Sequence, residues 1–264
     1  MKKIKLGVIQ ICSYENAIEN QKKIELYLKE ALKEGIKYIF LPEVFYSLSK
    51  NARKSENLVT DPQVQLQFYC ELAKKYDVYL IGGTVAVKEG DKVLNQVIHF
   101  YPDGSLKPIY NKNHLFSCII NKGLENEQII DENQSYDPGN LLASDSLPDF
   151  KLGLSVCFDL RYSHVYKYYR EQNCEIVSIS SAFTKITGAA HWHTLVRARA
   201  IENQYFIVAT NQWGIHNDKM ETYGHSLIVN PWGEVLLDLG EGEKFGFCEI
   251  DLSEIEKFRD AIQM

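Results

Sequence analysis

The chain has 264 residues, of which 45% are hydrophobic and 24% charged, an ordinary composition for a soluble globular protein with a substantial apolar core. Its formal net charge of −6 argues against a nucleic-acid partner, since affinity for phosphate backbones comes mainly from clustered lysine and arginine. Small molecules and other proteins remain as partners.

The first third of the chain alternates predicted strands and helices. Short apolar runs predict strands, and apolar residues at helical spacing predict amphipathic helices. In chain order we expect a strand at Ile4–Ile11, a helix at Asn20–Lys33, a strand at Tyr38–Leu41, a helix at Pro62–Tyr76 and a strand at Tyr79–Ile81. This alternation implies crossover connections, and the fully apolar strands imply sheets that are covered on both faces.

The remainder mixes hairpins with further buried strands. Turn residues between apolar runs predict two hairpins, and a polar stretch with little periodicity predicts a functional loop. We expect hairpins at Val97–Tyr110 and Ser226–Leu239, strands at Leu152–Phe158 and Glu175–Ser180, a helix at His191–Asn203 and the loop at Asn121–Asp149. No repeat or change in composition marks a boundary, so a single domain over residues 1–264 is expected.

The six cysteines are scattered and form no CxxC pair. They are best explained as free thiols in a reduced compartment. The apolar stretch near the start is too short and interrupted for a signal peptide, and no apolar run approaches the roughly 18 residues of a membrane span. We therefore expect a cytoplasmic protein without a membrane partner.

Three chemically capable side chains follow predicted strands. Glu43, Lys112 and Cys157 each come directly after an apolar run, and the carboxyl ends of strands are where sites gather in open α/β folds. Taken singly, a solvated glutamate, a surface lysine and an inert core thiol are the commoner interpretations. His114 raises the alternative of a Cys–His pair, and no metal-ligand spacing such as HExxH is present.

The local sequences around these residues are more specific. In order along the chain, they are Leu41-Pro42-Glu43-Val44-Phe45, Tyr110-Asn111-Lys112-Asn113-His114-Leu115-Phe116 and Gly153-Leu154-Ser155-Val156-Cys157-Phe158-Asp159-Leu160-Arg161-Tyr162. This set resembles the signatures of the nitrilase, or carbon–nitrogen hydrolase, superfamily. Further stretches resemble its Nit subgroup, which contains omega-amidases and deaminated glutathione amidases: residues 181–192, 197–204, 223–226 and 230–234.

The resemblance implies roles for the three residues. Cys157 matches the nucleophile, Glu43 the general base and Lys112 the catalytic lysine. A free thiol is only slightly ionised at neutral pH, so Glu43 accepts its proton while Lys112 favours the thiolate. Lys112 and the backbone N–H of Phe158 stabilise the oxyanion. A linear amide is then hydrolysed through a thioester to a carboxylate and ammonia, without a metal or organic cofactor.

A second glutamate is implied by a Pro-Gly pair. In the family, this glutamate stands six residues before the pair, and here Glu132 precedes Pro138-Gly139 by six. Asp131, Glu127 and Glu125 lie nearby and remain alternatives.

Several flanking residues admit two interpretations. Arg161 can hold a substrate carboxylate or form a structural pair with Asp159 or Glu202. Phe183, Thr187 and Trp192 are candidates for the substrate pocket, with core packing as the alternative. His114 is expected to orient neighbours by hydrogen bonding. Structural ion pairs are expected among the helix residues Arg197, Arg199 and Glu202.

One position departs from the family pattern. The residues after Arg161-Tyr162 are Ser163-His164, where the Nit subgroup has Pro-Glu or Ala-Glu. Ser163 is an adequate helix N-cap, so the following helix is expected to survive. The missing acid bears on substrate specificity, and His164 places there a side chain type that titrates near neutral pH.

The resemblance also implies the architecture and the substrate class. It implies an α/β fold, a four-layer α-β-β-α sandwich of two mixed sheets with helices on both outer faces. A homodimer is expected through the helices after Cys157 and after His191. Deaminated glutathione amidase is the leading activity, followed by omega-amidase on dicarboxylate monoamides and by N-carbamoyl amino acid hydrolysis; a nitrile is the least expected substrate. From another class, a catalytically silent partner-binding relative is the alternative.

Overall fold

The computed structural model describes residues 3–120, 128–217 and 220–263. A first sheet consists of β1 (Lys3–Gln10), β2 (Tyr38–Phe40), β3 (Tyr79–Ile81), β4 (Thr84–Glu89), β5 (Lys92–Phe100), β6 (Leu106–Asn111) and β17 (Lys244–Asp251). A second consists of β9 (Ser144–Ser146), β10 (Lys151–Val156), β11 (Ile176–Ser181), β12 (Phe206–Asn211), β15 (Leu227–Val229) and β16 (Val235–Asp238). Two separate hairpins pair β7 (Ser117–Ile120) with β8 (Gln128–Asp131) and β13 (Trp213–Asn217) with β14 (Met220–Tyr223). The helices are α1 (Ala17–Lys33), α2 (Pro62–Gln65), α3 (Gln67–Tyr76), α4 (Ser163–Glu171), α5 (Lys185–Asn203) and α6 (Glu254–Ala261).

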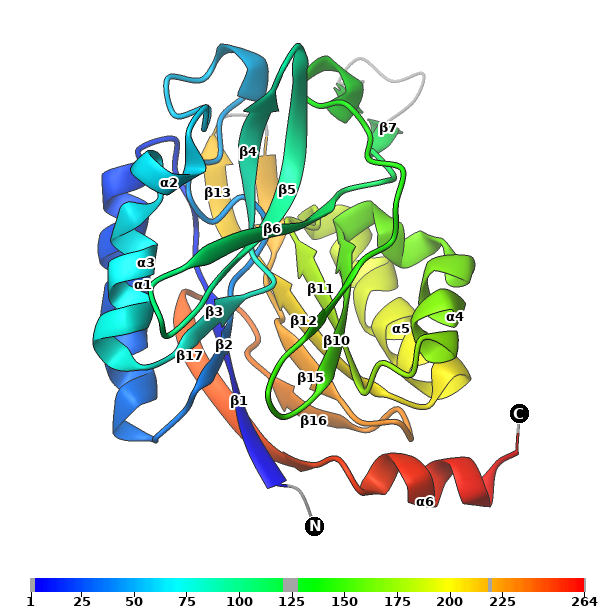
Figure 1. Ribbon diagram of the computed structural model, residues 1–264. Helices are drawn as coiled ribbons and strands as arrows, with labels where there is room; N and C mark the ends of the chain where they lie inside the picture. The colour runs from blue at the N-terminus through cyan, green and yellow to red at the C-terminus, as the bar shows by residue number, and fades with distance from the viewer. Residues whose placement is uncertain (1–2, 121–127, 218–219, 264) are drawn as a thin grey trace.

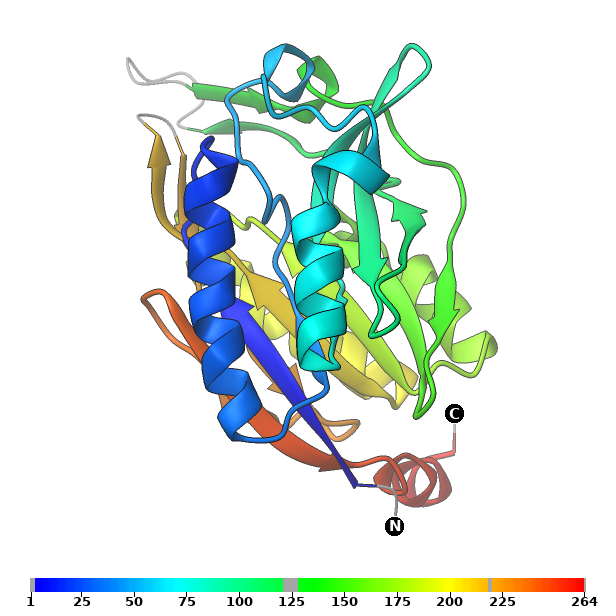
Figure 2. The ribbon, with the colours of Figure 1, turned by 60° about the vertical axis from the view of Figure 1, so that its left-hand side comes forward.

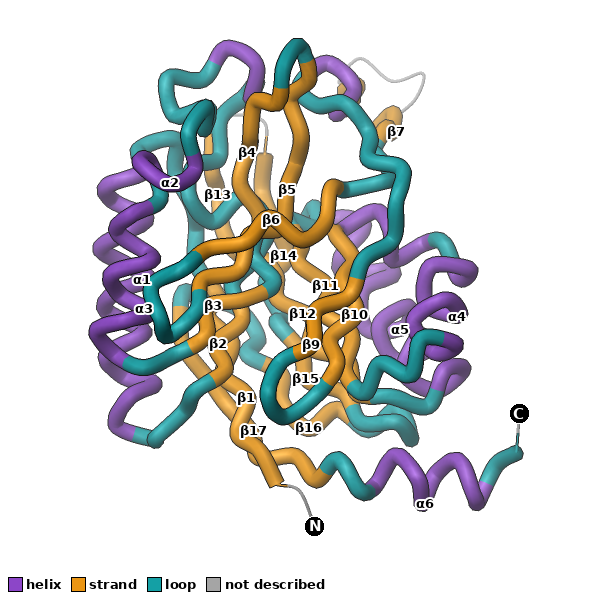
Figure 3. The backbone as a smooth tube through the Cα atoms, viewed as in Figure 1, coloured by secondary structure: helices purple, strands orange, loops and turns teal. Residues whose placement is uncertain are grey.

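The two large sheets lie face to face between two layers of helices (Figure 1). Helices α1 and α3 cover the outer face of the first sheet, side by side as Figure 2 shows, while α4 and α5 cover the second. Each sheet is mixed: β1, β2 and β3 run parallel, as do β10, β11 and β12, and antiparallel strands flank them. Figure 3 shows the strands gathered centrally between the helical layers. The expected four-layer α-β-β-α sandwich is confirmed.

The alternation of side chains along each strand builds two cores. Leu6 and Val8 of β1 lie in the core between the two sheets. Ile9 points to the other face and packs with Ile24 and Leu28 of α1. Successive strand residues point to opposite faces, so one strand serves both layers. Each fully buried aliphatic side chain stabilises the fold by about 1.5–3 kcal/mol.

The helices differ from the prediction at three places, two of them because of a side-chain cap. Helix α1 begins three residues before the predicted start, because the Asn16 side chain accepts hydrogen bonds from two backbone N–H groups of the first turn. Helix α5 begins at Lys185 rather than His191, capped by the Thr184 hydroxyl. The predicted helix at Pro62–Tyr76 is interrupted at Leu66, which separates α2 from α3.

The strand predictions are partly confirmed. Both hairpins form, within β5–β6 and β15–β16. Six strands and one helix outside residues 121–149 were not predicted: β4, β7, β12, β13, β14, β17 and α6. Of the polar stretch at 121–149, residues 121–127 lie outside the described residues, and the remainder includes β8 and β9 instead of one continuous loop. Within the described part of the chain, no helix is long and apolar enough to cross a membrane.

Candidate active site

Two sheets contribute the three candidate side chains. Glu43 follows β2 of the first sheet, Lys112 follows β6, and Cys157 follows β10 of the second sheet. The sheets are tied together here, since the Thr210 hydroxyl of β12 donates to the carbonyl of Leu41 at 2.9 Å. Glu43 and Cys157 line a cavity of about 340 Å³, and Lys112 is fully buried beside it. The fold thus gathers at one place the three residues that the sequence analysis singled out.

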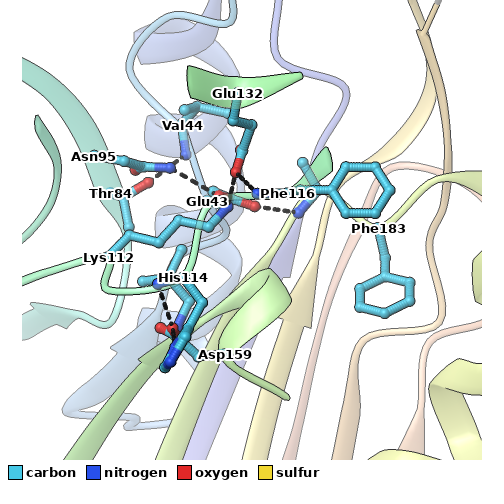
Figure 4. Close-up of polar contacts among 12 residues, drawn as sticks. Glu43, Val44, Thr84, Asn95, Lys112, His114, Phe116, Glu132, Asp159 and Phe183 are labelled. Carbon is cyan, nitrogen blue, oxygen red and sulfur yellow. Dashed lines mark hydrogen bonds and ion pairs between the residues drawn. The ribbon is translucent and has the colours of Figure 1, made fainter. Parts of the chain in front are cut away.

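A buried charge network lies against this cavity (Figure 4). The Lys112 Nζ is 2.9 Å from Glu43 Oε1 and 2.8 Å from Glu132 Oε1. Glu43 is also held by its two other partners: Asn95 Nδ2 donates to Oε1 and the Ala182 N–H donates to Oε2, each at 2.8 Å. With three donors of fixed position around its carboxylate, the side chain of Glu43 has one defined orientation.

The β7–β8 hairpin delivers the second carboxylate. Glu132 follows β8 directly and exchanges hydrogen bonds with Phe116, whose N–H donates to Glu132 Oε2 at 2.6 Å. Asp131 points elsewhere and accepts from the backbone of Asn133. Of the alternatives, Glu125 and Glu127 lie outside the described residues. Within the described part, Glu132 is the acid of this segment that reaches Lys112.

The glycine of the Pro-Gly pair after Glu132 has a steric reason. The N–H of Gly139 donates to the carbonyl of Lys112 at 2.8 Å. A Cβ atom on Gly139 would lie 2.3 Å from the carbonyl oxygen of Asn111, closer than any side chain permits. Because glycine has no side chain, this part of the chain can pack directly against residues 110–114, here called the lysine segment, and its hydrogen bond holds the backbone of Lys112 in place.

Backbone strain occurs on both sides of the cavity. Cys157 has φ +47° and starts a short 3₁₀ turn, Cys157–Arg161, which ends β10 at Val156, two residues before the predicted end. Val44, next to Glu43, has φ +50°, a rare conformation for a β-branched residue. Its N–H is held by the hydroxyl of Thr84 at 2.8 Å. Such conformations cost about 1–3 kcal/mol each, and they persist where surrounding contacts over-determine them.

Asp159 connects the 3₁₀ turn Cys157–Arg161, here called the cysteine turn, to the lysine segment. Its fully buried carboxylate accepts from the Val156 N–H at 2.9 Å and from the Tyr110 hydroxyl at 2.7 Å. The backbone N–H of His114 donates to it at 3.1 Å, and the Nδ1 of His114 is 2.7 Å from the same oxygen. The hydrogen-bonding role expected for His114 is confirmed, and in the described part of the chain it makes no hydrogen bond to Cys157.

Burial governs the ionisation of the thiol. Burial raises the pKa of Cys157 well above its ordinary value of 9.0, Glu43 raises it further, and Lys112 only partly opposes them. Lys112 thus favours the thiolate, as expected, but burial and the charge of Glu43 outweigh its effect on the pKa of Cys157. Two carboxyl groups surround a single ammonium, which leaves no surplus positive charge for the sulfur. A raised pKa favours the neutral thiol over the thiolate at neutral pH.

The partners of Lys112 keep it charged. Burial disfavours its ammonium form, but the charges of Glu132 and Glu43 outweigh that effect and hold the pKa of Lys112 well above its ordinary range. Burial also raises the pKa of Glu132, which Lys112 partly offsets. Among described contacts, the Cys157 sulfur makes no hydrogen bond to Glu43 or Lys112; the N–H of Ala182 lies near both the sulfur and Glu43.

A second, smaller cavity also borders Cys157. It has a volume of about 20 Å³ and is lined by Phe116, Cys157, Phe158, Arg161, Ala182, Phe183, Thr184 and Thr187. The Arg161 guanidinium lies 5.7 Å and 5.5 Å from the ring centroids of Phe158 and Phe183. Its Nη2 is 3.2 Å from His191 Nδ1. Arg161 therefore presents a cation to this cavity across two aromatic walls.

Neither structural pairing considered for Arg161 occurs among the described residues. Asp159 is occupied by the contacts above, and Glu202 pairs with Arg199 at 2.7 Å. The ion pair expected on this helix is thus confirmed for Arg199, whereas Arg197 donates to the carbonyl of Gly233 instead.

The other candidates for the substrate pocket lie in two different environments. Phe183 and Thr187 line the small cavity. Trp192 is fully buried and lines neither cavity as far as the described residues show; it packs 5.1 Å from Phe183, and its Nε1 donates to the carbonyl of His225. Packing is therefore the interpretation that the geometry of Trp192 favours.

The unusual Ser163-His164 pair begins α4. Ser163 is the first helical residue rather than the N-cap, a position held by Tyr162, so the predicted cap is wrong by one residue. The helix forms nonetheless. His164 is exposed, and its ring lies 5.7 Å from that of His114 and 6.0 Å from that of Tyr162. It stands beside the cysteine turn, where the Nit pattern has an acid.

Asn95 is a residue of the site that the sequence analysis did not identify. It lies on β5, is 1% exposed and donates to Glu43, while its Oδ1 has no partner among the described residues. The adjacent polar pair Asn95-Gln96 interrupts an otherwise apolar strand, and a polar residue on a buried strand was the available signal.

Comparison with known proteins gives one consistent result. Residues 5–260 match the family model described as carbon-nitrogen hydrolase. The chain is 34% identical to deaminated glutathione amidase of Dictyostelium discoideum over 274 aligned positions, which cover 99% of this chain and 93% of that protein. It is 30% identical to human omega-amidase NIT2 over 262 positions, 99% and 94% of the two chains.

Two crystal structures have the same fold. The NitFhit protein of Caenorhabditis elegans matches with a TM-score of 0.90 and 32% identity over 99% of this chain and 64% of that chain. Nit3 of Saccharomyces cerevisiae, described as a member of branch 10 of the nitrilase superfamily, matches with a TM-score of 0.87 and 28% identity over 100% and 95%.

Proposed function

The chain belongs to the carbon–nitrogen hydrolase family, and from this premise we propose that it hydrolyses a linear amide with Cys157 as the nucleophile. One observation carries the proposal. Cys157 and Glu43 line the same cavity of about 340 Å³, and Glu43 is hydrogen-bonded to the fully buried Lys112. A thiol, a carboxylate and a fixed positive charge are the groups that amide cleavage through a thioester requires.

Glu43 moves the proton in the first half of the reaction. The neutral thiol attacks the carbonyl carbon as its proton passes to Glu43, so a resting thiolate is not needed. Lys112 and the backbone N–H of Phe158 stabilise the resulting oxyanion, at about 3–4 kcal/mol for a single such donor. The carbon–nitrogen bond then breaks, and Glu43 returns the proton to the leaving nitrogen.

Water completes the cycle. Glu43, with Glu132 beside the same ammonium, accepts a proton from a water molecule that attacks the thioester carbonyl. The carbon–sulfur bond breaks, the carboxylate leaves and the sulfur regains its proton. The Glu132–Lys112 contact at 2.8 Å supports this role, because it keeps the second carboxylate within the same cavity.

For the substrate, we put deaminated glutathione first and short dicarboxylate monoamides second. A relative named deaminated glutathione amidase is 34% identical to this chain, and relatives named omega-amidase are 30% identical. Both substrates carry carboxylates, which the Arg161 guanidinium beside Cys157 suits. N-carbamoyl amino acids are third.

Product release tests the proposal. The purified chain is incubated with deaminated glutathione, alpha-ketoglutaramate or N-carbamoyl-beta-alanine, and both carboxylate and nitrogen products are measured, because a substituted amide releases an amine and a primary amide releases ammonia. We expect turnover of the first or second, lost in Cys157→Ala and kept in Cys174→Ala, which removes another buried thiol. Turnover that survives Cys157→Ala would exclude the sulfur from the mechanism. No turnover of any amide by the unmodified protein would favour the alternative of a catalytically silent, partner-binding relative.

We also propose that two copies pair through α4 and α5 in the cytoplasm. Ile186 and Ile201 of α5 are 64% and 46% exposed, which supports a covered face in the assembled protein. Light scattering after size exclusion measures the mass of the particle, and Ile201→Glu is expected to shift it toward one chain. A single-chain mass for the unmodified protein would contradict the pairing.

A further inference from the structure

Three side chains with metal-binding chemistry meet at the surface, and none of them lines either cavity beside Cys157. His193 lies on α5, His225 between β14 and β15, and Asp238 ends β16. The Nε2 of His193 is 3.0 Å from Asp238 Oδ2, and the Nδ1 of His225 is 3.0 Å and 3.1 Å from the two carboxylate oxygens. All three ligand atoms lie within 4.8 Å of one another.

These separations are close to those of a coordination shell. A transition-metal ion binds imidazole nitrogen and carboxylate oxygen at about 2.0–2.2 Å, which in a tetrahedral arrangement places ligand atoms roughly 3.3–3.6 Å apart. The three nitrogen–oxygen contacts, at 3.0, 3.0 and 3.1 Å, are a few tenths of an ångström short of that range, which small rotations of the side chains make up. All three residues are partly exposed, with side-chain exposures of 35%, 23% and 33%, which leaves a path for an ion.

Surrounding contacts hold the ligands in place. The N–H of Gly240 donates to Asp238 Oδ1 at 2.8 Å, and the N–H of His225 donates to the Gly240 carbonyl at 2.9 Å. The carbonyl of His225 accepts from Trp192 Nε1 at 2.7 Å, and the Tyr223 ring stacks on its imidazole at 4.4 Å. His225 itself has φ +54°, a conformation that a non-glycine residue keeps only when its surroundings enforce it.

We propose that His193, His225 and Asp238 bind one divalent ion of the late first-row series, such as Zn²⁺, Ni²⁺ or Co²⁺. Two imidazoles and one carboxylate suit these ions and not Mg²⁺ or Ca²⁺, which prefer oxygen ligands. Water completes the coordination. All ligands come from one chain, so binding does not require pairing of two copies, and the ion fastens α5 to the β15–β16 edge of the second sheet. The site is separate from the proposed amide chemistry.

Co²⁺ is the probe for the test. Calorimetry gives the number of ions bound per chain, and the visible spectrum distinguishes nitrogen and oxygen ligands from thiolates, which matters because six cysteines are present. We expect one Co²⁺ per chain without a thiolate charge-transfer band. His193→Ala and His225→Asn should each weaken binding about tenfold or more. Asparagine is chosen at position 225 because it tolerates the left-handed backbone.

His164→Ala is the matched control, since it removes an exposed histidine outside the cluster. It should leave the affinity unchanged. Thermal unfolding supplies a second readout: saturating Co²⁺ raises the melting temperature of the unmodified protein and of His164→Ala, but not of His193→Ala. Absence of binding to the unmodified protein overturns the proposal, and the Asp238 cluster is then a hydrogen-bond network only. Equal binding by both histidine variants also overturns it.

Discussion

Lys112→Met tests the buried charge network directly. Methionine keeps most of the length of the side chain and removes the charge. Lys112 has 0% side-chain exposure, and the carboxylates that it contacts are 3% and 21% exposed for Glu43 and Glu132. Removing one partner of a buried ion pair costs about 3–5 kcal/mol, because the remaining charge is uncompensated. Since domains are stable by roughly 5–15 kcal/mol, the variant should remain folded but melt at a lower temperature.

The loss of stability should depend on pH. Burial and Glu43 already raise the pKa of Glu132, and Lys112 opposes them. Without the lysine the folded-state pKa rises further above the unfolded one. A carboxyl with a raised folded-state pKa binds more protons when folded, so its contribution to stability falls as pH rises through that pKa. The stability deficit of Lys112→Met relative to the unmodified protein should therefore shrink as the pH is lowered toward about 5.

Activity should fall further than stability accounts for. Loss of one oxyanion donor lowers kcat by about 10²–10³-fold. Urea unfolding and kcat are measured for Lys112→Met, for Lys112→Met combined with Glu132→Gln, and for Lys107→Met, which removes an exposed lysine of the same strand. The double variant should regain stability without regaining activity. Lys107→Met should change stability by no more than about 0.5 kcal/mol.

Two results would refute this reasoning. Normal kcat in folded Lys112→Met would exclude the lysine from stabilising the oxyanion. A stability deficit of Lys112→Met that the added Glu132→Gln change does not reduce would show that the uncompensated carboxylate is not its cause.

Three further predictions follow from the same contacts. Because burial and Glu43 raise the pKa of Cys157, its alkylation rate should keep rising with pH to above 9.0, and a plateau below neutral pH would contradict the neutral resting thiol. Asp159→Asn should lower the free energy of unfolding by about 2–3 kcal/mol and should also lower kcat, because the cysteine turn and the lysine segment share that carboxylate. Urea unfolding and steady-state kinetics measure the two effects. An unchanged kcat would mean that Asp159 does not position Cys157 and Lys112. Burial lowers the pKa values of His99 and His216, so the unfolded chain binds more protons than the folded chain in acid. The melting temperature should therefore drop as the pH falls below about 6.5. A melting temperature that does not depend on pH in that range would contradict this prediction.

Much of the fold was readable from local patterns. The apolar runs at Tyr38–Leu41 and Tyr79–Ile81 correspond to β2 and β3, and the turn at Pro102-Asp103-Gly104 joins β5 to β6, because strand periodicity and turn chemistry are local properties. Helix starts were misplaced where a cap, Asn16 or Thr184, lay outside the periodic segment. The end of β10 was misplaced because positive φ at Cys157 is enforced by tertiary contacts.

By itself the sequence placed Glu43, Lys112 and Cys157 after strands, in ordered motifs that identify the family. It did not show which acid reaches Lys112, that Asn95 supports Glu43, or that His193, His225 and Asp238 meet, since those contacts join positions from 13 to 69 residues apart. Nor did it show that burial raises the pKa of Cys157. The pKa shift from desolvation depends on how completely protein atoms replace water around a group, and the packing of the two sheets against each other determines this.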